Sequence, residues 1–147
     1  MSNHKTCSIC KYLPDSIDIE TLHTEDRLPV QEKQLEIIGG LSSDSSLGQI
    51  RKCPSCDTYY VFVYDHDSES GMGPGYTDQS LYRISKEDAK ERLSKNIHFN
   101  QAYIEKLKTE SNLSSTLDTV KKQNMKKIIR YRKETKVIES HIKSMAT

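Results

Sequence analysis

The most regular pattern of apolar residues in the chain is that of a β-strand. Residues 58–65 read TYYVFVYD, a run of β-branched and aromatic side chains that favours extended structure. QIRKC (49–53) precedes this run, and the two segments predict a hairpin with the sequence CPSC at its tip. SLYRI (80–84) predicts a third strand, and the intervening HDSESGMGPGYTDQ (66–79) is typical of a loop.

The second half of the chain has a helical pattern. Ser85 is a good N-cap, and Asp88 stands three residues later, as in a capping box. Helix is expected from there, with a break near 110–115. Beyond the break, apolar or neutral residues recur in steps of three and four, which marks one face of a helix roughly 40 Å long. These positions are 117, 120, 124, 128, 131, 135, 138, 142 and 145.

The first half is less regular. VQEKQLEIIGGL (30–41) has Val30, Leu35, Ile38 and Leu41 near helical spacing, and Gly39-Gly40 would end that helix. SSDSSLG (42–48) is a loop by composition. Strands followed by helices predict an α+β fold, with one region over residues 1–84 and a helical region over 85–147.

The composition limits the core that this fold can build. Of 147 residues, 34% are hydrophobic and 29% are charged; there are two phenylalanines and no tryptophan. A chain this polar must leave much of itself solvated or gain stability from another source. A metal ion is one such source, because its binding free energy is also folding free energy.

Charge is distributed unevenly along the chain. Residues 1–120 carry 13 Lys/Arg and 19 Asp/Glu, a net of −6, whereas residues 121–147 carry 9 and 2, a net of +7. No stretch approaches the ~20 apolar residues of a membrane span, and MSNHKTCSIC lacks the apolar core of a signal peptide. We therefore expect a cytoplasmic protein, in a compartment that favours thiolate ligands over disulfides.

The four cysteines form two C-x-x-C pairs, Cys7-Ser-Ile-Cys10 and Cys53-Pro-Ser-Cys56. A tight turn across two residues lets both thiolates converge on one ion, and nearby backbone N–H groups can stabilise their charge. Two such turns predict a closed tetrahedral Cys₄ site with one structural zinc ion. The alternatives are iron in a rubredoxin-like site, two unrelated reduced pairs, and a redox-active pair, which would require a thioredoxin-like βαβ context.

With its two knuckles and a hairpin carrying the second one, RKCPSCDTYYVFVYD, the chain resembles the zinc-ribbon fold group over residues 5–12 and 49–84. The resemblance implies a small antiparallel zinc-ribbon sheet, here with an insertion between the cysteine pairs, but no particular function. Glycine often follows the second cysteine of a knuckle; Asp57 stands there and would have to adopt a left-handed turn. CPSCDTYY is also similar to segments of uncharacterised bacterial proteins, which implies no activity.

Other candidate sites are weaker. His4 lies near Cys7 and is an alternative ligand. Asp65-His66-Asp67 alternate in direction along a strand and so cannot share an ion. SGMGPGY (70–76) lacks the Gly-Lys-Ser/Thr ending of a phosphate loop, and no nucleophilic triad or carboxylate pair is recognisable. The sequence therefore gives no positive sign of an enzyme.

The last helix is strongly basic. Its cations indicate binding to the phosphates of a nucleic acid. Alternatively, they form a solvated face that complements the acidic remainder of the chain. They are Lys121, Lys122, Lys126, Lys127, Arg130, Arg132, Lys133 and Lys136.

The apolar stripe of this helix suits packing on the chain itself or on another helix. Asn124, Tyr131 and Thr135 on the stripe would weaken a coiled-coil homodimer. A helix that lies on a membrane surface would carry Trp or Phe on its apolar face.

Together these features predict a non-enzymatic, zinc-stabilised binding module that docks onto a protein partner. The acidic body suits a basic partner, as for an adaptor or an immunity-type protein. The second hypothesis is a regulatory protein that binds nucleic acid through the basic helix. The oligomeric state does not follow from the sequence.

Overall fold

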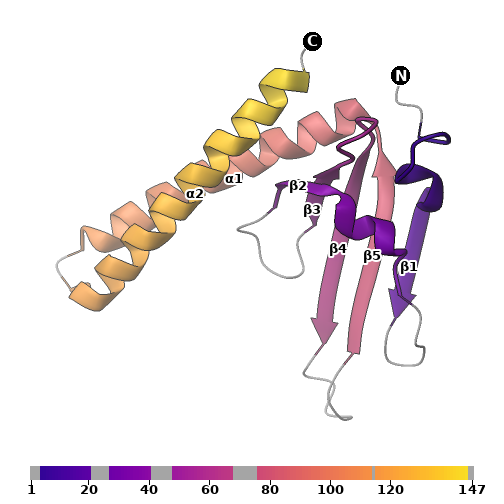
Figure 1. Ribbon diagram of the computed structural model, residues 1–147. Helices are drawn as coiled ribbons and strands as arrows, with labels where there is room; N and C mark the ends of the chain where they lie inside the picture. Colours follow the sequence, from indigo (N-terminus) through magenta and orange to yellow (C-terminus); the bar gives the residue numbers. More distant parts are fainter. Residues whose placement is uncertain (1–3, 21–26, 41–47, 68–75, 114, 146–147) are drawn as a thin grey trace. The chain divides into compact units, whose positions relative to one another are not determined.

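The computed structural model describes residues 4–20, 27–40, 48–67, 76–113 and 115–145. The chain divides into two compact units, residues 1–89 and residues 90–147, which we call the sheet unit and the helical unit. Five antiparallel strands are followed in sequence by two long helices (Figure 1). The predicted α+β class is therefore confirmed.

The sheet unit contains one sheet with the strand order β1-β5-β4-β3-β2 (Figure 1). Its strands are β1 (Ser16–Glu20), β2 (Glu36–Gly39), β3 (Gln49–Lys52), β4 (Tyr59–Asp67) and β5 (Tyr76–Ile84). The three strands expected from the sequence are β3, β4 and β5, and β3 pairs with β4 as the predicted hairpin around CPSC. Residues 66–67 and 76–79 of the expected loop are strand instead, because β4 and β5 stay paired out to Asp67 and Tyr76; residues 68–75 lie outside the described residues.

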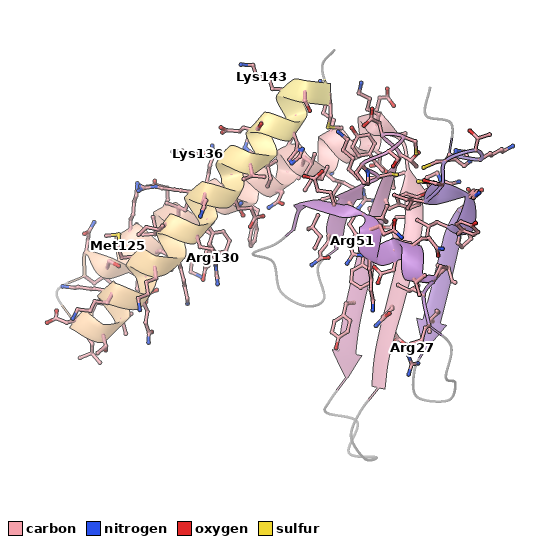
Figure 2. All side chains as sticks on the ribbon, in the orientation of Figure 1. Arg27, Arg51, Met125, Arg130, Lys136 and Lys143 are labelled. Atoms are coloured by element: carbon pink, nitrogen blue, oxygen red, sulfur yellow. The ribbon has the colours of Figure 1, made fainter. Side chains whose placement is uncertain are left out.

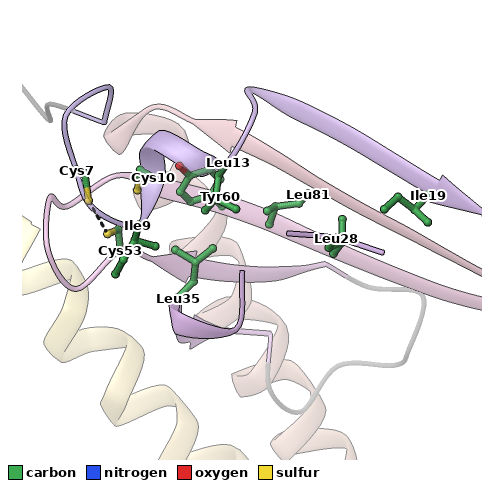
Figure 3. Close-up of a cluster of buried hydrophobic side chains, with 10 residues drawn as sticks. All are labelled: Cys7, Ile9, Cys10, Leu13, Ile19, Leu28, Leu35, Cys53, Tyr60 and Leu81. Carbon is green, nitrogen blue, oxygen red and sulfur yellow. Dashed lines mark hydrogen bonds between the residues drawn. The ribbon is translucent and has the colours of Figure 1, made fainter. Parts of the chain in front are cut away.

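One face of the sheet carries a core built with the N-terminal segment. Tyr60 and Leu81 lie on adjacent strands and are fully buried, and Ile9 and Leu13 come from the segment before β1. Leu35, which precedes β2, belongs to the same cluster (Figure 3). This arrangement brings the first cysteine pair, next to Ile9, against the sheet that carries the second pair.

The helix expected over residues 30–41 is wrong. Val30–Gln34 form a short 3₁₀-helix, η2, and Glu36–Gly39 then form β2, the edge strand paired with β3. Val30, assigned to the apolar face, is 71% exposed. The β-branched pair Ile37-Ile38 gains more from pairing with β3 than a short helix with two glycines would provide; Leu41 lies outside the described residues.

The chain needs a glycine at position 40, just after the edge strand β2. Gly40 has φ +81°, and a Cβ there would lie 2.5 Å from the carbonyl oxygen of Gly48. We expect Gly40→Ala to lower the free energy of unfolding by about 2–4 kcal/mol. Alanine would be strained at this positive φ, and its Cβ would clash with the backbone of Gly48. Urea unfolding would measure this loss. Gln34→Ala, an exposed change just before β2, should shift the midpoint little, and an equal midpoint for both variants would contradict the close approach.

The helical unit is an antiparallel hairpin of α1 (Lys86–Ser111), which begins in the sheet unit, and α2 (Asp118–Met145). Ser85 caps α1 as predicted: its Oγ accepts a hydrogen bond of 3.0 Å from the backbone N–H of Asp88. The predicted break lies between the two helices. Seven residues of α2 are buried, and all of them except Glu134 fall on the predicted stripe. They are Asn124, Ile128, Tyr131, Glu134, Thr135, Ile138 and Met145.

That stripe packs on α1. Ile128 and Tyr131 form one cluster with Ile104 and Leu107, and the Nδ2 atom of Asn100 donates a hydrogen bond of 3.3 Å to Thr135 Oγ1. Asn124 likewise donates to Ser111 Oγ at 3.2 Å. The polar seam residues that would weaken a homodimeric coiled coil thus have partners within the same chain.

Candidate metal centre

The four cysteines come together although 42 residues separate the two pairs. Cys7 and Cys10 lie at the start of the described chain, just before and within the 3₁₀-helix η1 (Cys10–Tyr12), and Cys53 and Cys56 lie in the β3–β4 turn. Their four Sγ atoms all lie within 4.8 Å of one another. The Cys7–Cys53 pair of sulfurs is 3.7 Å apart (Figure 3), and the Cys10–Cys56 pair is 3.4 Å apart.

These distances fit one tetrahedral metal ion. Metal–sulfur bonds of ~2.3 Å place the four sulfurs of a tetrahedron about 3.8 Å apart. A disulfide would require about 2.05 Å, and all four cysteines are free thiols. The cluster can therefore hold one metal ion. Within the described residues no other group of His, Cys, Asp or Glu is so arranged; His4 is not part of it, and the side chains of Asp65-His66-Asp67 are not described.

Backbone N–H groups support the first sulfur of each pair in the same way. The N–H groups of Ile9 and Cys10 hydrogen-bond Cys7, and those of Ser55 and Cys56 hydrogen-bond Cys53. The bond from Cys10 is the main cause that lowers the pKa of Cys7 to about 7, against the opposing effect of burial. For Cys53, burial has the larger effect and raises the pKa. Each turn thus places two donors where a thiolate needs them, whichever metal binds.

The second turn closes as the sequence requires. The N–H of Cys53 donates to the carbonyl oxygen of Thr58 at 2.8 Å, and Asp57 has φ 57°. Asp57 thus adopts the left-handed conformation expected in place of the usual glycine. The turn joins two antiparallel strands rather than a strand and a helix. This is not the context that a thioredoxin-like redox pair requires.

A buried tyrosine, Tyr60, and a partly buried arginine, Arg83, form a second layer around Cys10. The Tyr60 hydroxyl hydrogen-bonds the thiol and so opposes the rise in the pKa of Cys10 that burial causes. Arg83 donates to the Tyr60 hydroxyl at 3.4 Å and to the Leu13 carbonyl at 3.1 Å, and it forms an ion pair with Asp15. Four thiolates around a divalent ion carry a net charge of −2, and these donors face that charge.

The roles of Tyr60 and Arg83 were not predicted from the sequence. Tyr60 was assigned only to a strand, and Arg83 lies 73 positions after Cys10. The one available indication was that Arg83 lies between Tyr82 and Ile84 inside the predicted strand SLYRI. A buried strand position seldom holds arginine unless its charge has a partner.

All eight predicted cations lie on α2, and all eight are exposed. Because successive helical residues turn by about 100°, they cover the whole exposed side of α2 rather than one narrow stripe. Figure 2 labels Arg130 and Lys136, together with Met125 and Lys143, along this helix. None of the eight forms a salt bridge among the residues that the structure describes.

The charge asymmetry follows the division into units. The sheet unit carries 8 Lys/Arg and 15 Asp/Glu, a net of −7, and the helical unit carries 14 and 6, a net of +8. The excess of positive charge thus belongs to a separate structural unit that contains none of the cysteines.

Comparison with known proteins adds no family to these observations. No family model, curated protein or solved structure matches the chain. No helix among the described residues combines the length and apolarity needed to cross a membrane. The cysteine cluster and the cations of α2 are therefore the features that bear on function.

Proposed function

We propose that the protein is a zinc-stabilised, non-enzymatic module that binds nucleic acid through α2. The observation that carries this proposal is the set of eight exposed cations on one helix, none of which forms a salt bridge among the described residues. The metal centre contributes stability to the sheet unit, and the helical unit makes the contact.

Zinc is the proposed metal because four thiolates in a closed tetrahedral arrangement are its usual structural environment. The sulfur spacings of 3.4 and 3.7 Å support a single ion of that size. Iron would use the same four sulfurs. Elemental analysis of the purified protein separates the two metals.

The proposal of a non-enzymatic role depends on the number of ligands. Four sulfurs saturate a tetrahedral ion, so no coordination position is left for water or substrate. Three of the four cysteines are also buried, which keeps solvent from the ion. An ion held in this way stabilises a fold rather than activating a reactant.

Nucleic acid is the proposed partner because Lys and Arg clustered along one helix can neutralise the phosphates of a nucleic-acid backbone. Acidic residues are sparse among the cations of α2: Glu134 is the one acidic residue from 121 to 136, and it is buried. The net charge of +8 on the helical unit gives an attraction that acts at long range.

Charge reversal on α2 tests the proposal. We expect Lys122→Glu, Lys126→Glu and Lys133→Glu together to weaken binding of a mixed-sequence oligonucleotide at least a hundredfold, measured by fluorescence anisotropy at 50 mM salt. The matched control changes the net charge equally at exposed lysines outside α2: Lys5→Glu, Lys33→Glu and Lys90→Glu. Equal losses in the two variants would show that overall charge, and not α2, accounts for binding.

A second candidate partner is a basic protein, as predicted for an adaptor or immunity-type protein. The net charge of −7 on the sheet unit favours it. In that case the native protein would bind neither DNA nor RNA at 50 mM salt. A partner would instead co-purify at a defined stoichiometry, and reversal of exposed acidic residues of the sheet unit would release it.

A further inference from the structure

Three aromatic rings form a row across the helical hairpin. On α1 the rings of Phe99 and Tyr103 lie one turn apart, nearly parallel at 3°, with centroids 6.2 Å apart. Tyr103 in turn packs against Tyr131 of α2, with centroids 4.9 Å apart and planes 49° apart. We call Phe99, Tyr103 and Tyr131 the aromatic row.

The row runs from the core of the hairpin to its surface. Tyr131 is buried, Tyr103 is half-buried and Phe99 is 48% exposed. The inner two rings fix the position of the outer one, so a flat apolar ring is presented to solvent in a defined orientation. Only one other phenylalanine occurs in the chain, and its ring lies in the sheet unit under Arg51.

Cations flank the row on both helices. The Arg130 guanidinium lies 5.6 Å from the centroid of the Tyr131 ring, and Lys127 lies one turn before Tyr131. On α1, Lys95 is one turn before Phe99, and its ion pair with Glu91 is between two exposed side chains, which contributes little. The row therefore lies among groups that bind phosphate.

An exposed ring among cations matches the chemistry of single-stranded nucleic acid. Single-strand binders combine positive charge along the backbone with aromatic rings on which bases stack. In a duplex the faces of the bases are already stacked on each other, so Phe99 would have no ligand there. We infer that the aromatic row is a base-stacking site that makes the helical unit prefer single strands, an inference that rests on the proposed function.

The first test compares ligands. We expect Phe99→Leu to weaken binding of a 12-nucleotide single strand about tenfold and binding of a 12-base-pair duplex less than twofold, by anisotropy at 50 mM salt. Phe99→Tyr should restore single-strand binding, because it keeps the ring. Val30→Leu, an exposed apolar change in the sheet unit, should leave both affinities unchanged. Circular dichroism would check that each variant keeps its helices.

The second test reports on the stacking itself. The chain has eight tyrosines but no tryptophan, so Phe99→Trp introduces a single tryptophan at the proposed site, and its fluorescence can be excited selectively at wavelengths where tyrosine does not absorb. We expect single-stranded nucleic acid to quench its fluorescence and duplex to leave it nearly unchanged. Val30→Trp in the sheet unit provides the control, and neither ligand should quench it.

The outcomes separate the two proposals. Equal effects of Phe99→Leu on single strand and duplex, or no quenching in Phe99→Trp, would overturn the stacking site while the charge reversal on α2 still supports the proposed function. Failure of the native protein to bind either ligand would overturn both.

Discussion

Replacing Cys53 by serine is expected to remove the metal and unfold the sheet unit. Cys53 is fully buried, it is bonded through its backbone to Thr58, and its sulfur faces Cys7 at 3.7 Å. Structural zinc contributes an apparent ~10–16 kcal/mol at pH 7, against a total stability of about 5–15 kcal/mol for a typical domain. The sheet unit has few large apolar residues, so apolar burial cannot replace a stabilisation of that size.

Two measurements check this expectation on the full-length protein. Elemental analysis should give one zinc per native chain and much less than one for Cys53→Ser, and the thermal unfolding transition of the sheet unit should disappear. Ser8→Ala is the matched control, because Ser8 is exposed and lies in the first C-x-x-C pair without being a ligand. If Cys53→Ser keeps both its metal and its transition, the cluster is not the structural centre proposed here.

The parts of this architecture that depend on short stretches of sequence were predictable. The spacing of the cysteines, the strand after Cys56 and the cap at Ser85 are each set by a few adjacent residues, and the structure confirms all three. The β3–β4 hairpin then positions Cys53 and Cys56 through residues that are close to them in the sequence. The first pair could be assigned to the same site because no other cysteines remain in the chain.

The parts that depend on partners distant in the sequence were not predictable. Residues 36–39 form a strand because β3 is there to pair with them, and the isolated pattern looked helical. β1 was missed for a similar reason: its alternation of Ile17 and Ile19 is too short to stand out, and its pairing with β5 joins residues more than 50 positions apart. The second layer at Tyr60 and Arg83 exists only once the strands are assembled.

The aromatic row shows the same limit inside a helix. Phe99 and Tyr103 are one turn apart on α1, so their contact follows from helical spacing. Tyr131 joins them only because α2 folds back with Thr135 opposite Asn100. The exposure of the cations, in contrast, could be predicted from the position of the apolar stripe alone, because residues off the stripe of a surface helix face solvent.

The affinity for nucleic acid is expected to fall about a hundredfold between 50 and 200 mM salt. Each phosphate contact releases condensed counterions, so the logarithm of the binding constant falls with the logarithm of the salt concentration, with a slope of about −0.9 per contact for duplex and −0.7 for single strands. The eight cations surround the exposed side of α2, so one strand can meet about half of them at once. Four contacts give roughly 150-fold for duplex and 50-fold for a single strand.

Anisotropy titrations of the native protein at 50, 100 and 200 mM salt measure this slope. Lys126→Ala, which removes one exposed cation, should make the slope shallower by about 0.7–0.9, whereas Lys33→Ala in the sheet unit should leave it unchanged. A slope near zero would mean that the bound state does not depend on phosphate contacts. The cations of α2 would then serve to keep the helical unit soluble, and the acidic sheet unit would become the better candidate for the surface that binds a partner.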